Sequence, residues 1–548
     1  MLASSLRRVA GLVIAALALP FGAQAIELRD EFRAAIEQGL ANGRYQSVAV
    51  GLLDNGEQSQ WLFGTVEPGG AKPTAETVYE IGSTTRCFTG LLLAEALYAG
   101  KLRLDDTLGR IFADVHFADP KLAATTIGEI AAHRAGLPAI ASNLFPRSVD
   151  DPYVTFDAAA LKAYLAHAHA EGAGTYRYSE LGVALLGEIV ARADHKDYRS
   201  LVASDVLAPL TLTESGFGNV PHLVDGFRDG KPVPHWQHQM FAPASGLRAS
   251  LSDLMRFAAA ALRPDKTALR AAILLARQPR AAAGGGETAL AWQIVPVESD
   301  GQTWPLLWQA GITGGFASFV GLRTDKQRAV VLLGNAGVDL SALGLTLMAD
   351  RSAPQPPPKL LPIVAPASLA YPGLYRFDTG GDLLVRATEE GLSMQIGGYL
   401  PQAMSAYDED AFEVAAAAGQ LTFERQDTKV IGAILHRGGT NLHATRLSEA
   451  APTLKRNTSA LDAKELAAYA GDYALSSSMR AHVVVAPPGL RAQLTGTAPT
   501  FLQSCAHDRF CDADGTLEIG FMREKGGKAI ALDWRQGVFE VRATRDDW

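Results

Sequence analysis

Cysteine is scarce in this chain, which limits what can hold its fold together. Only three cysteines occur among 548 residues, so a disulfide framework cannot be the main source of stability. Cys505 and Cys511 are close enough in the sequence to form one bridge in an oxidising compartment, whereas Cys87 stands alone in an apolar stretch. Buried cysteine usually acts as a small apolar residue. We therefore expect Cys87 to contribute packing rather than to act as a nucleophile.

Long apolar runs are also missing, with one exception near the N-terminus. The run Val9–Leu19 follows Arg7 and Arg8 and precedes Ala-Gln-Ala at 23–25. This order is typical of a signal peptide with a small-residue cleavage site, and the run is shorter than the roughly 20 apolar residues of a membrane span. We expect cleavage to leave a mature chain that begins at Ile26 and is periplasmic or secreted in a bacterium.

Positive charge is in deficit. Lysine and arginine total 50 against 58 acidic residues, which gives a formal charge of -8, and loss of Arg7 and Arg8 with the leader makes it -10. An acidic balance argues against nucleic acid or anionic lipid as a partner. The sequence has no Gly-x-Ser-x-Gly elbow and no glycine loop for phosphate. The histidine pairs at 167–169 and 235–238 lack a third ligand at metal-binding spacing, so no metal and no cofactor are implied.

A proline-rich connector at residues 351–364 divides the chain, which is too long for a single core. Before the connector, helical spacing alternates with short strand-like runs, which indicates a mixed α/β domain over residues 26–350. The clearest helices and strands are expected at Asp30–Ala41, Leu91–Ala99, Val48–Leu53 and Ala329–Leu333.

After the connector the chain repeats itself at an offset of 98 residues. The residues that recur without a gap are Tyr371, Gly373, Tyr375, Phe412, Phe423 and Arg425, matched by Tyr469, Gly471, Tyr473, Phe510, Phe521 and Arg523. Each copy alternates short apolar runs with glycine, aspartate and proline. This pattern predicts two small antiparallel β-barrels, at residues 365–450 and 458–548.

A serine opens an apolar helix in the segment Tyr79–Gly90. Ser83 and Arg86 are three residues apart and therefore share a helix face. The segment resembles the Ser-x-x-Lys motif of the penicillin-recognising serine hydrolases, the group that holds class C β-lactamases, DD-peptidases, D-aminopeptidases and related esterases. It departs from that motif at Arg86, because arginine stays protonated where the family's lysine can shed its proton.

Further blocks extend the resemblance over about residues 40 to 340. Ile130–Pro138 resembles the Leu-Leu-Thr-His-Thr-Ser-Gly-Leu-Pro block, with His133 expected to be a hydrogen-bonded structural residue, and Pro243–Leu247 resembles Pro-Ala-Gly-Gly-Leu. The resemblance implies a sheet with a helical subdomain for the first domain. The layout of three domains is similar to that of the D-aminopeptidases, in which a barrel covers the catalytic cleft.

The second and third family motifs are altered as well. Tyr178-Ser179-Glu180 is similar to Tyr-x-Asn, with Glu180 in the asparagine's place and Tyr178 kept. Gln309-Ala310-Gly311 stands where the family has Lys/His-x-Gly, so Gln309 brings no positive charge. By position, the resemblance implies substrate contacts at Gln309, Gly311 and Thr313, and an oxyanion hole made by the amides of Ser83 and Ile312.

The replacements at 86 and 180 are compatible with each other, because Arg86 and Glu180 can form an ion pair, even a bidentate one. Three interpretations remain open. Arg86 holds Tyr178 near its ionised form and makes it the base, Glu180 is the base, or the pair fills a site without activity.

The resemblance implies an exported serine hydrolase, with weakened or altered catalysis, that acts on amide or ester bonds of peptides or small acyl compounds. Ser83 would attack, Tyr178 would relay the proton, and water would release the acyl group. Peptidoglycan fragments are candidate substrates. The alternative is an inactive relative that binds peptides or cell-wall fragments.

Overall fold

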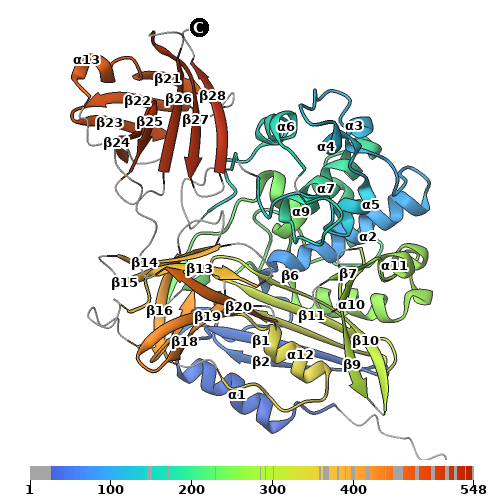
Figure 1. The fold of residues 1–548 in the computed structure, drawn as a ribbon. Helices are drawn as coiled ribbons and strands as arrows, with labels where there is room; N and C mark the ends of the chain where they lie inside the picture. The colour runs from blue at the N-terminus through green and yellow to red at the C-terminus, as the bar shows by residue number, and fades with distance from the viewer. Residues whose placement is uncertain are drawn as a thin grey trace, which may run out of the picture.

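The computed structural model places an α/β domain first and two closed β-barrels after it (Figure 1). It describes residues 26–545 except 142, 145–150, 171, 229, 284–285, 291, 300, 357–358, 362–369, 379–381, 389–390, 397–401, 415–418, 438–439, 449–460, 476–479, 495–499, 513–516, 524–526 and 537–538. The leader expected at residues 1–25 lies outside this range.

The first domain is built on an eight-stranded antiparallel sheet. Its strands, in spatial order, are β2 (Glu57–Gly64), β1 (Ser47–Asp54), β12 (Arg328–Gly334), β11 (Ala317–Arg323), β10 (Gln302–Ile312), β9 (Gln293–Ser299), β8 (Gly286–Thr288) and β7 (Ala281–Ala283). Strand β1, from the start of this domain, therefore pairs with β12, from its end, as the second and third strands of the sheet, where Val50 pairs with Leu332.

Both faces of the central strands are covered, so these strands are apolar throughout. Val48 and Val50 of β1 face a cluster that includes α1 (Asp30–Ala41) and α12 (Ser341–Met348). Ala49 and Leu53, on the opposite face of the same strand, join the core of the helical layer. Alternation of side chains across a strand thus produces two cores from one sequence run.

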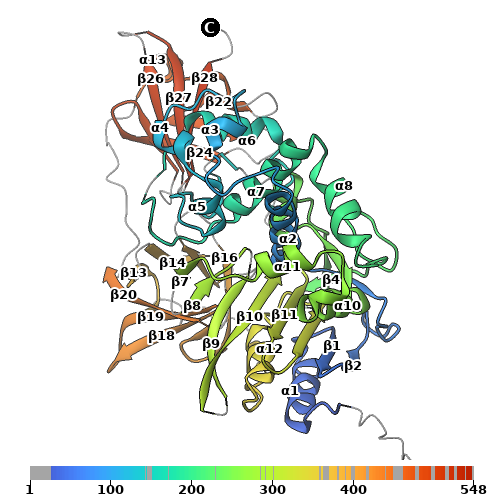
Figure 2. The same cartoon turned by 90° about the vertical axis from the view of Figure 1, so that its right-hand side faces the viewer.

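The helical layer lies on the other face of the sheet, as the perpendicular view makes clear (Figure 2). Its helices are α2 (Thr85–Tyr98), α3 (Leu108–Ile111), α4 (Pro120–Ala124), α5 (Ile127–Ala131), α6 (Ala158–His167), α7 (Glu180–Asp194), α8 (Tyr198–Val202), η2 (Ala203–Leu207), η3 (Gln239–Phe241), α9 (Ala242–Ser245), α10 (Leu251–Leu262), η4 (Pro264–Lys266) and α11 (Arg270–Ala276). Nearly all of α2 is buried, as expected for a helix that is apolar on every side. Cys87 lies within it and is a buried free thiol, whose pKa burial raises.

Five further short elements complete the first domain. They are the 3₁₀ turn η1 (Gly82–Thr84), the pair β3 (Val78–Glu80) with β6 (Arg248–Ser250), and the hairpin β4 (Gly226–Arg228) with β5 (Lys231–Val233).

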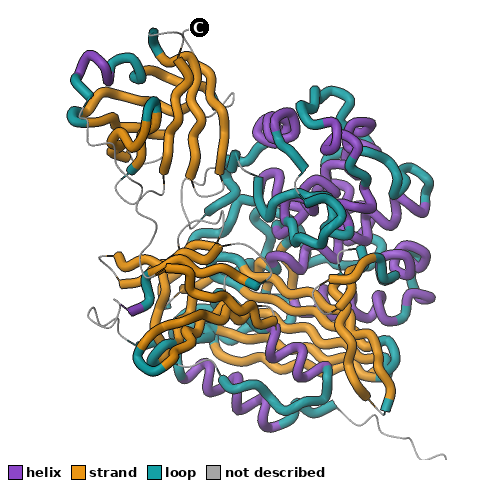
Figure 3. The backbone as a smooth tube through the Cα atoms, in the orientation of Figure 1, coloured by secondary structure: helices purple, strands orange, loops and turns teal. Residues whose placement is uncertain are grey.

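Each C-terminal copy is an eight-stranded closed barrel whose strands follow one another in chain order, and Figure 3 separates these strand-rich parts from the helical layer. Barrel 1 contains β13 (Gly373–Phe377), β14 (Asp382–Thr388), β15 (Gly391–Ile396), β16 (Gln402–Asp408), β17 (Ala411–Val414), β18 (Gly419–Gln426), β19 (Lys429–Arg437) and β20 (Thr440–Ser448). Barrel 2 follows α13 (Ala463–Leu466) and contains β21 (Gly471–Ala474), β22 (Arg480–Ala486), β23 (Gly489–Leu494), β24 (Thr500–Ala506), β25 (Arg509–Cys511), β26 (Leu517–Arg523), β27 (Ala529–Gln536) and β28 (Phe539–Arg545).

The two barrels confirm the repeat in detail. In barrel 1 the Tyr375 hydroxyl donates to the Tyr371 carbonyl at 2.6 Å, and in barrel 2 Tyr473 donates to Tyr469 at the same distance. Equal hydrogen bonds at positions 98 residues apart indicate one supersecondary unit used twice. The bridge between Cys505 and Cys511 is present in the second copy.

The barrels contact different parts of the first domain. Arg44, which follows α1, forms an ion pair with Glu413 on β17 of barrel 1. The core of barrel 2 joins the apolar cluster of the helical layer. Among the described residues, no helix has the length and apolar character needed to cross a bilayer.

Candidate active site

Ser83 lies at the point where the sheet side of the first domain meets the helical layer. The 3₁₀ turn η1 delivers it directly into α2, and its side chain stays partly exposed while Thr84 and Thr85 beside it are fully buried. A partly exposed hydroxyl on a rigid, buried element is well placed to be approached by a substrate.

Arg86 is buried and points back at Ser83. Its Nη2 donates to the Ser83 Oγ at 2.8 Å, and its guanidinium carbon lies 4.5 Å from the centre of the Tyr178 ring. The first contact confirms the expectation that Ser83 and Arg86 share a helix face. A guanidinium is always a donor, so it stabilises negative charge on the serine oxygen but cannot accept the serine's proton.

Glu180 contacts Arg86 as the sequence predicts, but more loosely than a bidentate pair. A single distance, 3.5 Å between Arg86 Nη2 and Glu180 Oε1, joins the two groups. The other carboxylate oxygen accepts a hydrogen bond from the Tyr153 hydroxyl at 2.7 Å. Glu180 also begins α7, capped by Ser179, where the helix dipole favours its negative charge.

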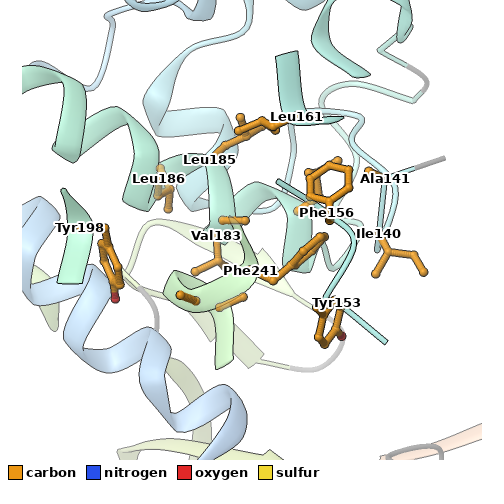
Figure 4. Packing of buried hydrophobic residues seen from close by; sticks show 14 of the residues in the cluster. Ile140, Ala141, Tyr153, Phe156, Leu161, Val183, Leu185, Leu186, Tyr198 and Phe241 are labelled. Atoms are coloured by element: carbon orange, nitrogen blue, oxygen red, sulfur yellow. The ribbon is translucent and has the colours of Figure 1, made fainter. Parts of the chain in front are cut away.

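Tyr153 was not identifiable as a site residue from the sequence. It lies 27 residues before Glu180 in a segment without a motif, and its ring stacks on Phe241 at 4.7 Å. Figure 4 shows Tyr153, Phe156 and Phe241 gathered in the core beside α7. Aromatic packing therefore fixes the hydroxyl that orients Glu180.

Tyr178 lies between Arg86 and His133. Its ring centre is 5.1 Å from that of His133, and the His133 Nδ1 accepts the amide hydrogen of Ser179 at 3.2 Å. Desolvation, together with the nearby charge of Arg86, lowers the pKa of His133 to about 3. His133 is therefore a neutral, hydrogen-bonded structural residue at neutral pH, in line with its expected role.

Gln309 lines the opposite side of Ser83, on β10. Its Nε2 donates to the Ser83 carbonyl oxygen at 3.4 Å, and its Oε1 accepts from Gln293 at 3.2 Å. Both contacts are neutral, so this strand presents no charge at the position. Further along, Gly311 directly faces the serine turn and Thr313 is fully buried.

Two glycines bring the amides of Ser83 and Ile312 together. A Cβ added to Gly82, whose φ is +47°, would lie 2.8 Å from the Ile312 nitrogen. One added to Gly311 would lie 2.5 Å from the Ser83 nitrogen. Contacts this close are possible only without side chains. The turn and the strand therefore meet backbone to backbone at the residues that adjoin these two amides.

Glu80, three residues before Ser83, anchors the segment that carries the serine. Like Tyr153, it could not be recognised as a site residue from the sequence. Its buried carboxylate accepts from Arg248 at 3.0 Å and from the Trp236 amide at 3.2 Å, and it lies 3.1 Å from the His235 Nδ1. Burial alone would raise the pKa of Glu80, but the His235 hydrogen bond and the charges of His238 and Arg248 bring it below the ordinary value. Glu80 therefore stays ionised and holds the strand that leads to the serine.

The described residues contain no cluster of three histidine, cysteine, aspartate or glutamate side chains able to hold a metal ion.

The comparisons with known proteins identify the fold first. A class C beta-lactamase from Rhodobacter sphaeroides superposes with a TM-score of 0.51 at 19% identity, covering 56% of this chain and 95% of that one. At this identity the likeness shows the fold alone, the α/β fold of that beta-lactamase.

The family follows from the sequence. The beta-lactamase family profile matches residues 32–353, more than half of the chain, and the chain belongs to this family. Curated relatives include a beta-lactamase of Escherichia coli K12, 23% identical over 325 residues that cover 53% of this chain and 83% of the relative. A beta-lactamase of Pseudomonas fluorescens is 25% identical over 355 residues, covering 57% of this chain and 94% of the relative.

Proposed function

We propose that this protein is an exported serine hydrolase that cleaves amide or ester bonds of peptides or small acyl compounds through an acyl-serine intermediate. The observation that carries the proposal is the close approach of the turn at Gly82 and the strand at Gly311, which supports an oxyanion hole made by the adjoining amides of Ser83 and Ile312. Two converging backbone donors stabilise the oxyanion of a tetrahedral intermediate whatever the neighbouring side chains are.

The serine's proton goes to Tyr178 in this proposal. A phenolate at Tyr178 is favoured by the Arg86 charge 4.5 Å from its ring. As the Ser83 Oγ bonds to the carbonyl carbon, the phenolate takes the proton and then gives it to the departing amine or alcohol. Water later adds to the acyl carbon and releases the acid and free Ser83.

Glu180 is the weaker candidate for the base. One of its oxygens faces Arg86 and the other accepts from Tyr153, so both are engaged with donors. Glu180 then acts through Arg86, as the group that positions the guanidinium.

Catalysis is slow in this proposal because Arg86 cannot exchange a proton. Loss of a general base costs typically 10²- to 10⁴-fold. The relatives named as beta-lactamases support a hydrolytic reaction of this class, while the altered motifs favour a different rate or substrate.

A second function, binding without turnover, is favoured by a separate observation. The Ser83 Oγ, Arg86, Glu180 and Tyr153 form a continuous chain of contacts. In such a chain the guanidinium donates to the serine oxygen but cannot take its proton. A site of this kind, without catalytic activity, would bind peptides or cell-wall fragments.

The decisive experiment is covalent labelling of the purified protein with a fluorophosphonate. The native protein should label slowly and Ser83→Ala should not label. Restoring the family pattern with Arg86→Lys and Glu180→Asn together should raise the labelling rate by about 10²-fold or more. A native protein that stays unlabelled while the restored variant reacts would favour binding without turnover, and failure of both folded proteins would contradict the oxyanion role of Ile312.

Export rests on the leader-like residues before Ile26. Mass spectrometry of periplasmic material should find a chain that begins at Ile26, and an intact chain from Met1 in that fraction would contradict it.

A further inference from the structure

The carboxylate of Glu180 divides its two oxygens between two unlike donors. Oε2 accepts a hydrogen bond from the Tyr153 hydroxyl at 2.7 Å, whereas Oε1 lies 3.5 Å from Arg86 Nη2. Hydrogen bonds from a hydroxyl are usually about 2.7 Å long and those from an N–H group about 2.9 Å. The contact with the neutral phenol therefore has its ordinary length, and the contact with the oppositely charged guanidinium is stretched.

A stretched ion pair is not what a guanidinium and a carboxylate favour on their own. The two groups prefer a bidentate contact with two parallel N–H···O hydrogen bonds. Both side chains are shielded from solvent, with exposures of 3% for Arg86 and 12% for Glu180, so salt and water screen their attraction only weakly. The observed separation therefore requires a restraint on one of the two partners.

The nitrogen that faces Glu180 also holds the serine oxygen. Arg86 Nη2 donates to the Ser83 Oγ at 2.8 Å, and the same Nη2 makes the 3.5 Å contact with Glu180 Oε1. A carboxylate that closes on the guanidinium therefore pulls on the nitrogen that donates to the serine. The two contacts compete for one group.

Tyr153 is fixed by its ring, independently of its hydroxyl. The ring stacks on Phe241 at 4.7 Å and on His238 at 5.7 Å, and it packs edge-on against Trp236 at 5.6 Å. Figure 4 shows Tyr153 and Phe241 close together in this core. Aromatic contacts on several sides hold the hydroxyl at one point, so the phenol can restrain Glu180 without following it.

We propose that Tyr153 is a positioning residue that keeps the Glu180 carboxylate from closing on Arg86. The guanidinium Nη2 then remains available to the Ser83 Oγ. Tyr153 acts through two other side chains rather than on the substrate. For its effect on rate the inference rests on the proposed hydrolase function, because the guanidinium stabilises the serine oxygen as that oxygen gives up its proton.

The variant Tyr153→Phe of the full-length protein tests this role, because it removes the hydroxyl and keeps the ring in its aromatic contacts. Labelling with fluorophosphonate should slow by about tenfold or more, the usual effect of losing a hydrogen bond to a charged group. The matched control is Tyr198→Phe, which removes a buried hydroxyl that is bonded to Thr89 on the serine's own helix at 2.7 Å. This control should label at the native rate.

A second pair of variants separates positioning from packing. In Glu180→Gln the neutral amide cannot form an ion pair with Arg86, so Tyr153 has no ion pair to hold open. Adding Tyr153→Phe to Glu180→Gln should then change the labelling rate by less than about twofold, which is the non-additivity expected of residues that act on one another. Equal slowing by Tyr153→Phe in both backgrounds would show a merely structural role and overturn the inference.

Crystal structures of the native protein and of Tyr153→Phe give a readout that needs no turnover. The variant should show two N···O contacts of about 2.9 Å between Arg86 and Glu180 and a longer distance from Arg86 Nη2 to the Ser83 Oγ. An unchanged Ser83 contact, or labelling of Tyr153→Phe at the native rate, would overturn the positioning role. A native protein that never labels, although Tyr153→Phe closes the ion pair in the crystal, would keep this role and lose the hydrolase function. The two failures are thereby distinguishable.

Discussion

At the scale of single residues, Arg86 decides which chemistry is open to Ser83. Its 2.8 Å hydrogen bond to the Ser83 Oγ favours the alkoxide electrostatically, yet a guanidinium cannot remove the proton that must leave. Tyr178 and Glu180 are the groups beside Arg86 that can change protonation state. In the proposed reaction, proton transfer therefore falls to a neighbouring side chain and not to residue 86.

His133 should make the folded protein sensitive to acid. Its pKa is about 3 in the folded state against an ordinary value near 6.5, so the unfolded chain binds the extra proton first. The contribution to stability is present above pH 6.5 and is lost as the pH falls towards 3, at up to about 1.4 kcal/mol per pH unit.

The substitution His133→Asn tests this, because asparagine tolerates the positive φ of 55° at this position. Melting temperatures measured between pH 7 and pH 4 should fall less steeply for the variant than for the native protein. The control is His507→Asn, at an exposed position, which should follow the native curve. Parallel curves for His133→Asn and native protein would contradict the prediction.

The residues that the sequence singles out lie near one another because a motif preserves spacing even when its side chains change. Ser83, Arg86, Tyr178, Glu180 and Gln309 do come together. Tyr153 and Glu80 could not be predicted in the same way. Their roles depend on tertiary contacts, with Phe241 for the first and Arg248 for the second, and neither contact has a signature in local sequence.

At the scale of elements, the site depends on how closely a turn and a strand approach. The expected helix at Asp30–Ala41 matches α1, and the strand expected at Val48–Leu53 lies within β1, because helical spacing in the first and a continuous apolar run in the second both report burial. The close contact between η1 and β10 has no such pattern in the sequence. In the sequence it is marked only by two glycines, Gly82 in the turn and Gly311 in the strand.

Gly311→Ala should therefore disable the site. The new Cβ would lie 2.0 Å from the Ile81 carbonyl oxygen and 2.5 Å from the Ser83 nitrogen, so the strand and the turn must separate. Loss of one oxyanion donor costs about 10²- to 10³-fold, and fluorophosphonate labelling should slow by that factor.

Gly520→Ala in barrel 2 is the control, because its Cβ would meet only Arg509, at 4.0 Å. It should label at the native rate. Native-like labelling of Gly311→Ala would show that the two amides do not act together.

At the scale of the whole molecule, barrel 1 is held to the first domain by an ion pair that is largely shielded from solvent. The side chain of Arg44 is 6% exposed and that of Glu413 is 19% exposed. Removing one partner of such a pair leaves the other facing a low-dielectric surrounding. Glu413→Gln should lower the free energy of unfolding by roughly 2 kcal/mol. Calorimetry should show this as a lower temperature of the first unfolding transition.

Asp382→Asn supplies the comparison. It removes the partner of Arg376 in the same barrel, where the pair is exposed to solvent, and it should leave the transition nearly unchanged. Equal shifts for the two variants would show that Glu413 has no special part in the domain boundary.

The position of Glu413 also records how the two barrels diverged after duplication. Adding the offset of 98 residues gives Cys511, and the strand pairs correspond, with Ser405 opposite Glu413 and Gln503 opposite Cys511. One ancestral site has thus become an electrostatic anchor in the first copy and one end of a covalent crosslink in the second. The copies are homologous but no longer interchangeable. A chimera with the second barrel in the first position would bring a half-cystine to Arg44 and leave the domain boundary without its acid.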